Sequence, residues 1–256
     1  MYYTGIDIGS TATKVVVFDE KKENILHKVM IPSGWNSRET SEKVLEWLGT
    51  EGVTPENSVI ISTGYGRISV PYADKQITEI TCHGKGALFL HPEDATVIDI
   101  GGQDTKIIYL QDGMVTDFIM NDKCSAGTGK FLEIMANRLG VTIGEIFELA
   151  EKGNPITISS MCTVFAESEV ISLMGKGSPK EDIANGVILS IVQKVSSQEK
   201  KSSGNNTEYF LTGGFCDTPY MMEELGKALG GNVSSHPDGR FAGAIGAALL
   251  GRKKKS

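Results

Sequence analysis

The chain has 256 residues, of which 40% are hydrophobic and 22% charged, and this composition is typical of a folded protein with a sizeable core. Its net charge of −7 argues against a nucleic-acid-binding protein, because such proteins carry a basic face for the phosphates. No apolar run reaches the roughly 18 residues that a membrane-spanning helix needs. Because the chain opens on a strand-like segment and not on a secretion signal, we expect a cytoplasmic protein that does not use a membrane.

The first half of the chain predicts strands followed by helices, and this order then repeats. Short runs rich in β-branched residues predict strands at 3–8, 13–19, 25–31 and 59–63. The spacing of apolar residues predicts helices at about 37–49 and 77–90. Residues 95–120 repeat the opening meander, so the pattern indicates an α/β fold built by duplication.

The second half of the chain is mostly helical. Helices are expected at 128–139, 142–152, 164–175 and 179–198, and a polar loop at 200–206 precedes a last strand at 209–212. Gly213-Gly214 is expected to open a helix that runs to about residue 229. We expect a first lobe at 1–92, with a terminal helix within 241–256 packing back onto it, and a second lobe at 93–240.

One short signature occurs twice in the chain. Ile6-Asp7-Ile8-Gly9 is followed by Thr13-Lys14, and Ile98-Asp99-Ile100-Gly101 is followed by Thr105-Lys106 at the same spacing. Each copy predicts a hairpin whose turn exposes backbone N–H groups and whose first strand carries a carboxylate, which suits a phosphate chain and its Mg²⁺. Two matched copies favour two similar lobes that hold one nucleotide over two merely structural hairpins.

A third glycine turn, Leu211-Thr212-Gly213-Gly214-Phe215, follows the last expected strand. At such a turn the backbone can approach a ligand closely, and a helix start can face negative charge or a nucleobase. Together with Gly243-Ala244-Ile245-Gly246-Ala247-Ala248, the three turns resemble the acetate and sugar kinase, Hsp70 and actin superfamily. This resemblance implies a duplicated actin-like (ribonuclease H-like) two-lobe ATPase fold that binds ATP or ADP with Mg²⁺.

The same resemblance implies a role for each motif residue. Asp7 would approach the metal ion through water from the first lobe, and Asp99 would hold the metal or its water shell from the second. Gln103 and Asp104 stand at the second hairpin tip, where an amide could orient the attacking water; otherwise Gln103 is a plain turn residue. The expected nucleotide-binding residues are Gly9, Ser10, Thr11, Thr13, Lys14, Gly101 and Gly102 at the phosphates, and Gly213, Gly214 and Asp217 at the adenosine.

Two of the four cysteines lie in similar settings. Cys124 (in NDKCSAGTGKFLE) and Cys162 (in SSMCTVFAESEVIS) each stand immediately before an expected helix, where a thiolate or a thiolate-bound cluster is stabilised. The alternative is that each is a small buried hydrophobic residue. Neither belongs to a Cys-x-x-Cys pair, and two thiolates are half of what a [4Fe-4S] cluster normally needs. A two-fold homodimer would supply the other half. Cys82 and Cys216 are expected to be structural.

The cysteine segments and IDIGGQDTK resemble the ATP-dependent activators of 2-hydroxyacyl-CoA dehydratases, in the BadF/BadG/BcrA/BcrD ATPase family. That resemblance implies a homodimer with one bridging [4Fe-4S] cluster. ATP hydrolysis would drive a lobe movement that delivers a low-potential electron from a ferredoxin or flavodoxin to the partner dehydratase. The chain departs from the family pattern at Phe215-Cys216-Asp217-Thr218-Pro219, where relatives often have a smaller aliphatic residue and a downstream Asn, so the adenosine contact of Asp217 stays open.

Other functions are compatible with parts of the sequence. The partner could be a benzoyl-CoA-type or double-cubane cluster reductase, since the sequence does not name the acyl-CoA. A small-molecule kinase of the same fold would leave the cysteine segments unexplained and would need a sugar-binding signature, which is not evident. A nucleotide-switched scaffold or filament protein is the alternative from a different class.

Overall fold

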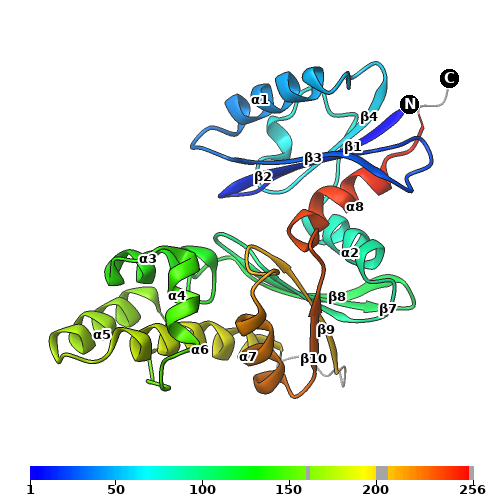
Figure 1. Cartoon of the computed structure of the whole chain (residues 1–256). Helices are drawn as coiled ribbons and strands as arrows, with labels where there is room; N and C mark the ends of the chain where they lie inside the picture. Colours follow the sequence, from blue (N-terminus) through cyan, green and yellow to red (C-terminus); the bar gives the residue numbers. More distant parts are fainter. Residues whose placement is uncertain (160–161, 200–206, 254–256) are drawn as a thin grey trace. The chain divides into compact units, whose positions relative to one another are not determined.

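The computed structural model describes residues 1–159, 162–199 and 207–253 (Figure 1). The chain forms two compact units. The first comprises residues 1–94, 110–116 and 237–256, and the second comprises residues 95–109 and 117–236. In the described part of the chain, no helix is both long and apolar enough to cross a membrane.

The first unit contains a five-stranded sheet in the order β3-β2-β1-β4-β5. Its strands are β1 (Tyr2–Ile8), β2 (Ala12–Phe18), β3 (Ile25–Pro32), β4 (Ser58–Thr63) and β5 (Lys75–Gln76). β1 to β3 form an antiparallel meander, whereas β4 runs parallel to β1. A parallel neighbour requires a crossover connection, and α1 (Ser37–Thr50) supplies it.

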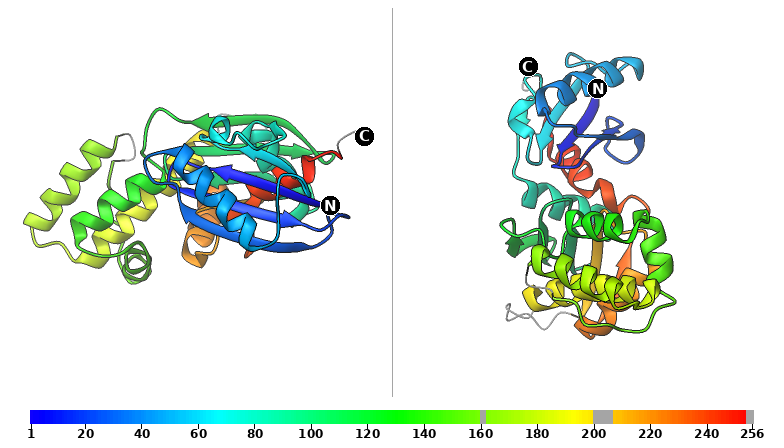
Figure 2. Two further views of the ribbon diagram at one scale, coloured as in Figure 1. Left: turned by 90° about the horizontal axis from the view of Figure 1, so that it is seen from above. Right: turned by 90° about the vertical axis from the view of Figure 1, so that its left-hand side faces the viewer.

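Alternating side chains of β2 pack on opposite faces of this sheet. Val15 and Val17 pack on the face covered by α1 (Figure 2). Val16 and Phe18 pack on the other face, which α8 (Ala242–Leu250) covers. All four valine and phenylalanine side chains are fully buried, so the sheet is the middle layer of a helix-sheet-helix arrangement.

The second unit repeats this architecture. Its sheet has the order β10-β9-β6-β7-β8, of which only the β7–β8 turn at 110–116 belongs to the first unit. β6 pairs antiparallel with β7 and parallel with β9, as β1 does with β2 and β4. The strands are β6 (Thr96–Ile100), β7 (Thr105–Gln111), β8 (Met114–Asn121), β9 (Glu208–Gly213) and β10 (Asn232–Ser235). The helices are α3 (Gly129–Leu139), α4 (Ile143–Ala150), α5 (Thr163–Gly175), α6 (Lys180–Glu199) and α7 (Pro219–Leu229). The predicted duplicated α/β fold is confirmed.

Three local expectations were wrong. The strand at 209–212 is not the last one, because β10 follows it, and the two-residue β5 was not foreseen. The helix after Gly213-Gly214 begins only at Pro219, because residues 214–217 form turns. Proline at the first helical position loses no hydrogen bond and fixes the start there. The loop expected at 200–206 lies outside the described residues.

Helix α2 (Glu79–Leu90) and α8 cross in unusually close contact within the first unit. A Cβ atom at Gly246 of α8 would lie 1.7 Å from the Cys82 carbonyl oxygen. Reciprocally, a Cβ atom at Gly86 of α2 would lie 1.9 Å from the Ala242 carbonyl oxygen. Because backbone atoms cannot turn aside as side chains can, both positions require glycine.

We therefore expect Gly246→Ala to destabilise the protein by about 3 kcal/mol, near the upper end of the range for overpacking. Gly49→Ala is the matched control, because no atom lies within 4 Å of the added Cβ and alanine favours a helix by about 1 kcal/mol. Urea unfolding monitored by circular dichroism measures both. Equal stability of the two variants would contradict the close helix crossing.

Candidate functional site

The first hairpin joins β1 to β2 in the first unit. Asp7 lies opposite Lys14 in the strand register, and the Gly9 N–H donates to the Ala12 carbonyl across the turn at 3.2 Å. Ser10 is half-buried and Thr11 exposed at the tip. The Thr13 hydroxyl instead lies within the fold, 2.8 Å from Ser33 Oγ, and the residue is fully buried.

The Asp7 carboxylate is enclosed by two glycines. A Cβ at Gly64, which follows β4, would lie 2.4 Å from Asp7 Oδ1. A Cβ at Gly243 of α8 would lie 2.6 Å from Asp7 Oδ2. The side chain is only 2% exposed. The packing of β4 and α8 against β1 therefore fixes this carboxylate, and any side chain at either glycine would displace it.

The second hairpin joins β6 to β7 and carries a buried lysine. Asp99 lies opposite Lys106, and the Gly101 N–H donates to the Asp104 carbonyl at 2.9 Å. Lys106 Nζ lies 3.1 Å from Asp99 Oδ2 and 2.9 Å from Asp104 Oδ1, with its side chain 1% exposed. Gln103 is exposed at the tip. The Lys106 ammonium thus forms ion pairs with two carboxylates. The sequence had not indicated that Asp104 pairs with Lys106.

The glycine turn after β9 lies against the second hairpin. A Cβ at Gly213 would lie 2.7 Å from Asp99 Oδ1, and its φ of +84° is one that side chains disfavour. The Thr212 hydroxyl donates to Asp99 Oδ1 at 3.3 Å. Gly213 thus adjoins the Asp99 carboxylate, whereas Gly214 and Asp217 are exposed on the following turn.

This arrangement has a counterpart in the first unit that sequence reasoning missed. Gly64 has a φ of +83°, and it meets Asp7 as Gly213 meets Asp99. The signal was present, since Thr63-Gly64 and Thr212-Gly213 are the same dipeptide at the end of the strand parallel to the hairpin. The duplication therefore includes three strands and a glycine turn in each unit.

The segment before α3 is tied to the second hairpin tip. The N–H groups of Gly129 and Lys130 donate to the carbonyls of Gly101 and Gly102 at 2.9 and 2.8 Å. The Thr105 hydroxyl donates to the Gly127 carbonyl at 2.8 Å. The first turn of α3 and the second hairpin are therefore joined by hydrogen bonds.

The two cysteines differ in local structure. Cys162 is the N-cap residue of α5, as expected. Cys124 was also expected immediately before a helix, and this is wrong: it lies in a loop, and α3 begins only after its N-cap Thr128. Gly127, with a φ of +84°, turns the chain between Cys124 and α3.

A hydrogen bond joins the residues that follow the two cysteines. Ser125 Oγ and Thr163 Oγ1 are 2.8 Å apart, so the chain segments of Cys124 and Cys162 lie side by side. Both cysteines are half-buried. Among the described residues, none of the four cysteines forms a disulfide, and cysteine thiolates are the ligands that soft metal centres prefer.

The other two cysteines lie in the hydrophobic cores. Cys82 packs in the cluster between the first sheet and α8, and Cys216 packs in the core of the second unit. Burial raises the pKa of the Cys82 thiol to about 12, so this thiol stays protonated. Neither position offers the access that a metal ligand needs.

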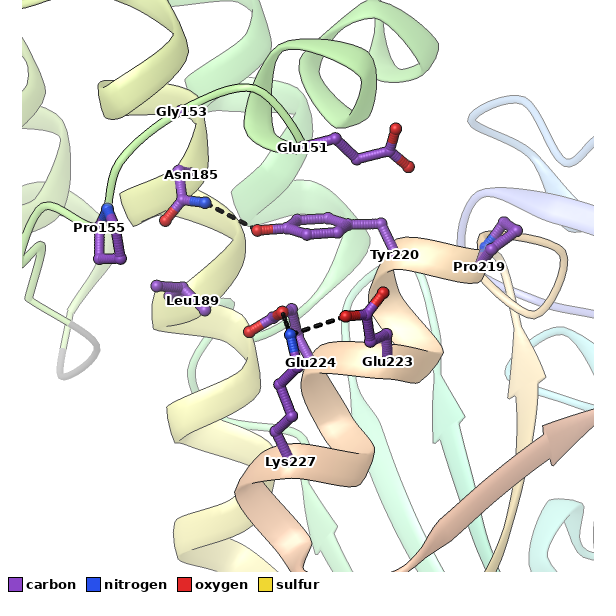
Figure 3. A pocket seen from close by; sticks show the side chains of 10 residues that line it. All are labelled: Glu151, Gly153, Pro155, Asn185, Leu189, Pro219, Tyr220, Glu223, Glu224 and Lys227. Atoms are coloured by element: carbon purple, nitrogen blue, oxygen red, sulfur yellow. Dashed lines mark hydrogen bonds and ion pairs between the residues drawn. The ribbon is translucent and has the colours of Figure 1, made fainter.

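A surface pocket of about 520 Å³ opens elsewhere in the second unit, between the end of α4, α6 and α7 (Figure 3). Asn185 Nδ2 donates to the Tyr220 hydroxyl at 2.7 Å and to the Ala150 carbonyl at 2.9 Å. Lys227 pairs with Glu223 and Glu224, each at 2.7 Å. The bonds of Asn185 connect the three helices, and none of the hairpin residues lines this pocket.

Replacing Lys106 with Met should destabilise the protein by about 3 kcal/mol, because two enclosed carboxylates would lose the ammonium that lies between them. Lys14→Met is the matched control at the equivalent position of the first hairpin, where the half-buried lysine should cost less than about 1 kcal/mol. Urea unfolding of both variants is the measurement. If Lys14→Met lowered the free energy of unfolding as much as Lys106→Met, the buried ion pairs would not be the cause.

Iodoacetamide should label Cys124 and Cys162 of the metal-free, reduced protein and spare Cys82 and Cys216. The reason is access, together with the raised pKa of Cys82, since only an accessible thiolate reacts quickly. Peptide mass spectrometry after short exposure measures each site. Rapid labelling of Cys82 in the folded protein would contradict its buried position.

Known proteins match over the whole chain. The (R)-2-hydroxyglutaryl-CoA dehydratase activating ATPase of Acidaminococcus fermentans is 41% identical over 257 residues, covering 99% of this chain and 98% of the relative. A component of the benzoyl-CoA reductase of Thauera aromatica is 30% identical over 259 residues, covering 96% of this chain and 92% of the relative.

Solved structures agree with these matches. Component A of the Acidaminococcus fermentans dehydratase superposes with a TM-score of 0.91 at 40% identity, covering 98% of this chain and 97% of that one. The activator of the 2-hydroxyisocaproyl-CoA dehydratase from Clostridium difficile was solved with bound ADPNP. It matches with a TM-score of 0.90 at 38% identity, covering 98% of this chain and 94% of that one. A glucokinase of Streptomyces griseus at 14% identity and a TM-score of 0.63 shares the fold alone. The model of the BadF/BadG/BcrA/BcrD ATPase family matches residues 4–251, and the chain belongs to this ATPase family.

Proposed function

We propose that the protein is an ATP-dependent electron-transfer activator of a 2-hydroxyacyl-CoA dehydratase. The observation that carries this proposal is the hydrogen bond between Ser125 and Thr163, which joins two accessible cysteine segments in the unit that holds the second phosphate hairpin. A nucleotide-binding kinase would have no use for this pair. The relatives named as dehydratase activators support the same function.

The duplicated hairpins would hold Mg²⁺ and the phosphates of ATP. Asp7 and Asp99 are the carboxylates for the metal ion or its water shell, since Mg²⁺ prefers oxygen ligands and retains several waters. Glycine N–H groups at the hairpin tips suit the phosphate oxygens. The proposed phosphate contacts are Gly9, Ser10, Thr11, Thr13, Lys14, Gly101 and Gly102.

The exposed residues of the second unit would complete the nucleotide site. Gln103, at the hairpin tip, would orient an attacking water molecule through its amide, and Asp104 pairs with Lys106. Gly214 and Asp217 are exposed on the turn after β9 and would face the adenosine. Gly213 contributes by leaving room for the Asp99 carboxylate.

The two cysteines fit half of a [4Fe-4S] site. Each chain offers two half-buried thiols, and the N-cap position of Cys162 places it at the positive end of a helix. The cluster normally needs four thiolates, so a second copy of the chain would supply Cys124 and Cys162 again. When bound, the cluster would supply a one-electron redox centre.

The surface beside Cys162 suits such a homodimer. Val164 and Phe165, in the first turn of α5, are 66% and 62% exposed. Ile171, two helical turns further along α5, is also exposed. An exposed apolar patch next to a half-complete ligand set indicates contact with another chain, and a second copy is the occupant that completes the ligand set.

The electron donor and the acceptor would be other proteins. A ferredoxin or flavodoxin is the proposed donor, since both carry single electrons at low potential. The proposed acceptor is a 2-hydroxyacyl-CoA dehydratase. The match to a component of a benzoyl-CoA reductase makes such a reductase the second candidate acceptor, and reconstitution of the activator with each purified acceptor separates the two.

Anaerobically purified protein should be a brown dimer with about four iron atoms per dimer, and Cys124→Ser and Cys162→Ser should each lose most of this iron. The reason is that each substitution removes two of the four proposed thiolates. Iron analysis and the EPR spectrum of the dithionite-reduced protein are the measurements.

Cys216→Ser is the matched control, because Cys216 is buried and should leave the iron content unchanged in the folded protein. A colourless, iron-free wild-type protein prepared under strict anaerobiosis would overturn the electron-transfer function. In that case, phosphate transfer stimulated by a small molecule would favour a kinase, and polymerisation with ATP would favour a filament protein.

A further inference from the structure

Hydrogen bonds run without a break from the second phosphate hairpin to the cysteine pair. At the hairpin, the carbonyls of Gly101 and Gly102 accept from the N–H groups of Gly129 and Lys130 at 2.9 and 2.8 Å. A Cβ at Gly129 would lie 3.3 Å from the Gly101 carbonyl oxygen, so α3 starts almost in contact with the hairpin backbone. A shift of the hairpin tip therefore moves the first turn of α3.

The next bonds lead from α3 to the Cys124 loop. Thr128, the N-cap of α3, is fully buried. Both its N–H group and its hydroxyl donate to the Ser125 carbonyl, at 3.1 and 2.6 Å. The Asn121 amide holds the other side of the loop by donating to the Cys124 carbonyl at 2.8 Å. The position of the Cys124 backbone is thus set by α3.

The last bond crosses to the second cysteine. Ser125 Oγ lies 2.8 Å from Thr163 Oγ1, and Thr163 is the first residue of α5, directly after Cys162. The Cys162 carbonyl accepts the Ala166 N–H at 3.0 Å, so Cys162 moves with α5. The ion pair of Arg138 with Glu167 is a second bridge between α3 and α5.

We propose that Ser125, Thr128 and Thr163 are positioning residues that transmit the state of the nucleotide hairpin to both cysteine sulfurs. This inference rests on the proposed function for the identity of the nucleotide and of the metal centre. A rigid chain of short bonds between two sites gives energetic coupling only if one site biases an element that the other also contacts. Here that element is the start of α3 with its attached loop.

The arrangement explains why both cysteines are connected to one hairpin. The Cys124 loop contacts α3 directly, whereas Cys162 is reached through the Ser125–Thr163 bond. Removing that bond should uncouple Cys162 more than Cys124. Removing the Thr128 hydroxyl should weaken the coupling to both.

The test uses the full-length, metal-free chain and the iodoacetamide rates of Cys124 and Cys162. Saturating Mg²⁺ and a non-hydrolysable ATP analogue should change the rate at both cysteines of the wild type by about fivefold or more, the lower end of typical site-to-site coupling. Thr163→Val and Ser125→Ala should retain the analogue affinity within about twofold and lose most of the change at Cys162. Thr163→Ser should restore it, since it keeps the hydroxyl.

Ser168→Ala is the matched control on the same helix, because the Ser168 hydroxyl donates to the Val164 carbonyl within its own helix. It should behave as the wild type. A nucleotide-dependent change that persists at Cys162 in both Ser125→Ala and Thr163→Val would overturn the inference. So would a wild-type protein that binds the analogue without any change at either cysteine.

Two further measurements separate this inference from the proposed function. Titration of the analogue into each variant reports nucleotide binding directly, and iron analysis of anaerobic preparations reports the cluster. A wild type that binds no nucleotide or no iron overturns the proposed function and the inference with it. If iron and nucleotide binding are normal but Ser125→Ala and Thr163→Val respond to the analogue as the wild type does, only the inference is overturned.

Discussion

The aspartate of each hairpin can lie where it does only because the neighbouring parallel strand ends in glycine. At Gly64 and Gly213 a Cβ would stand 2.4 and 2.7 Å from the carboxylate of Asp7 and Asp99, respectively. Both glycines also have a positive φ, which turns the chain away after the strand. The position of each carboxylate, and hence of any metal ion near it, depends on this contact and not on the hairpin alone.

In the second unit, hydrogen bonds also connect the hairpin to the start of α3. Its hairpin carbonyls accept the N–H groups at the start of α3, groups that have no partner within a helix. The helix start is therefore satisfied by the hairpin instead of by a side chain. Because the same segment continues back to Cys124, the proposed phosphate site and the proposed metal site would share one stretch of backbone.

Repetition in the sequence predicted the duplicated sheets of the fold. It did not predict contacts between residues far apart in the chain. Matching Asp7-Lys14 with Asp99-Lys106 sufficed to predict two similar lobes, because period-2 strands and glycine turns are local signals. The Ser125–Thr163 bond could not be predicted, since it joins residues far apart in the chain by packing of α3 on α5. The helix expected at 128–139 is found as α3, but Cys124 does not directly precede it, because a left-handed turn at Gly127 separates the two.

The two units differ, despite their common plan, in the connection that contains Cys124 and Cys162. Helices α3 to α6 lie between β8 and β9, whereas the equivalent connection in the first unit, between β3 and β4, holds only α1. The inserted helices share one core with the second sheet, where Leu132, Ile146 and Ile188 lie in the same cluster as Ile98 and Leu211. They also leave Val164 and Phe165 of α5 exposed. In the proposed homodimer, a second chain would cover this exposed apolar face beside Cys162.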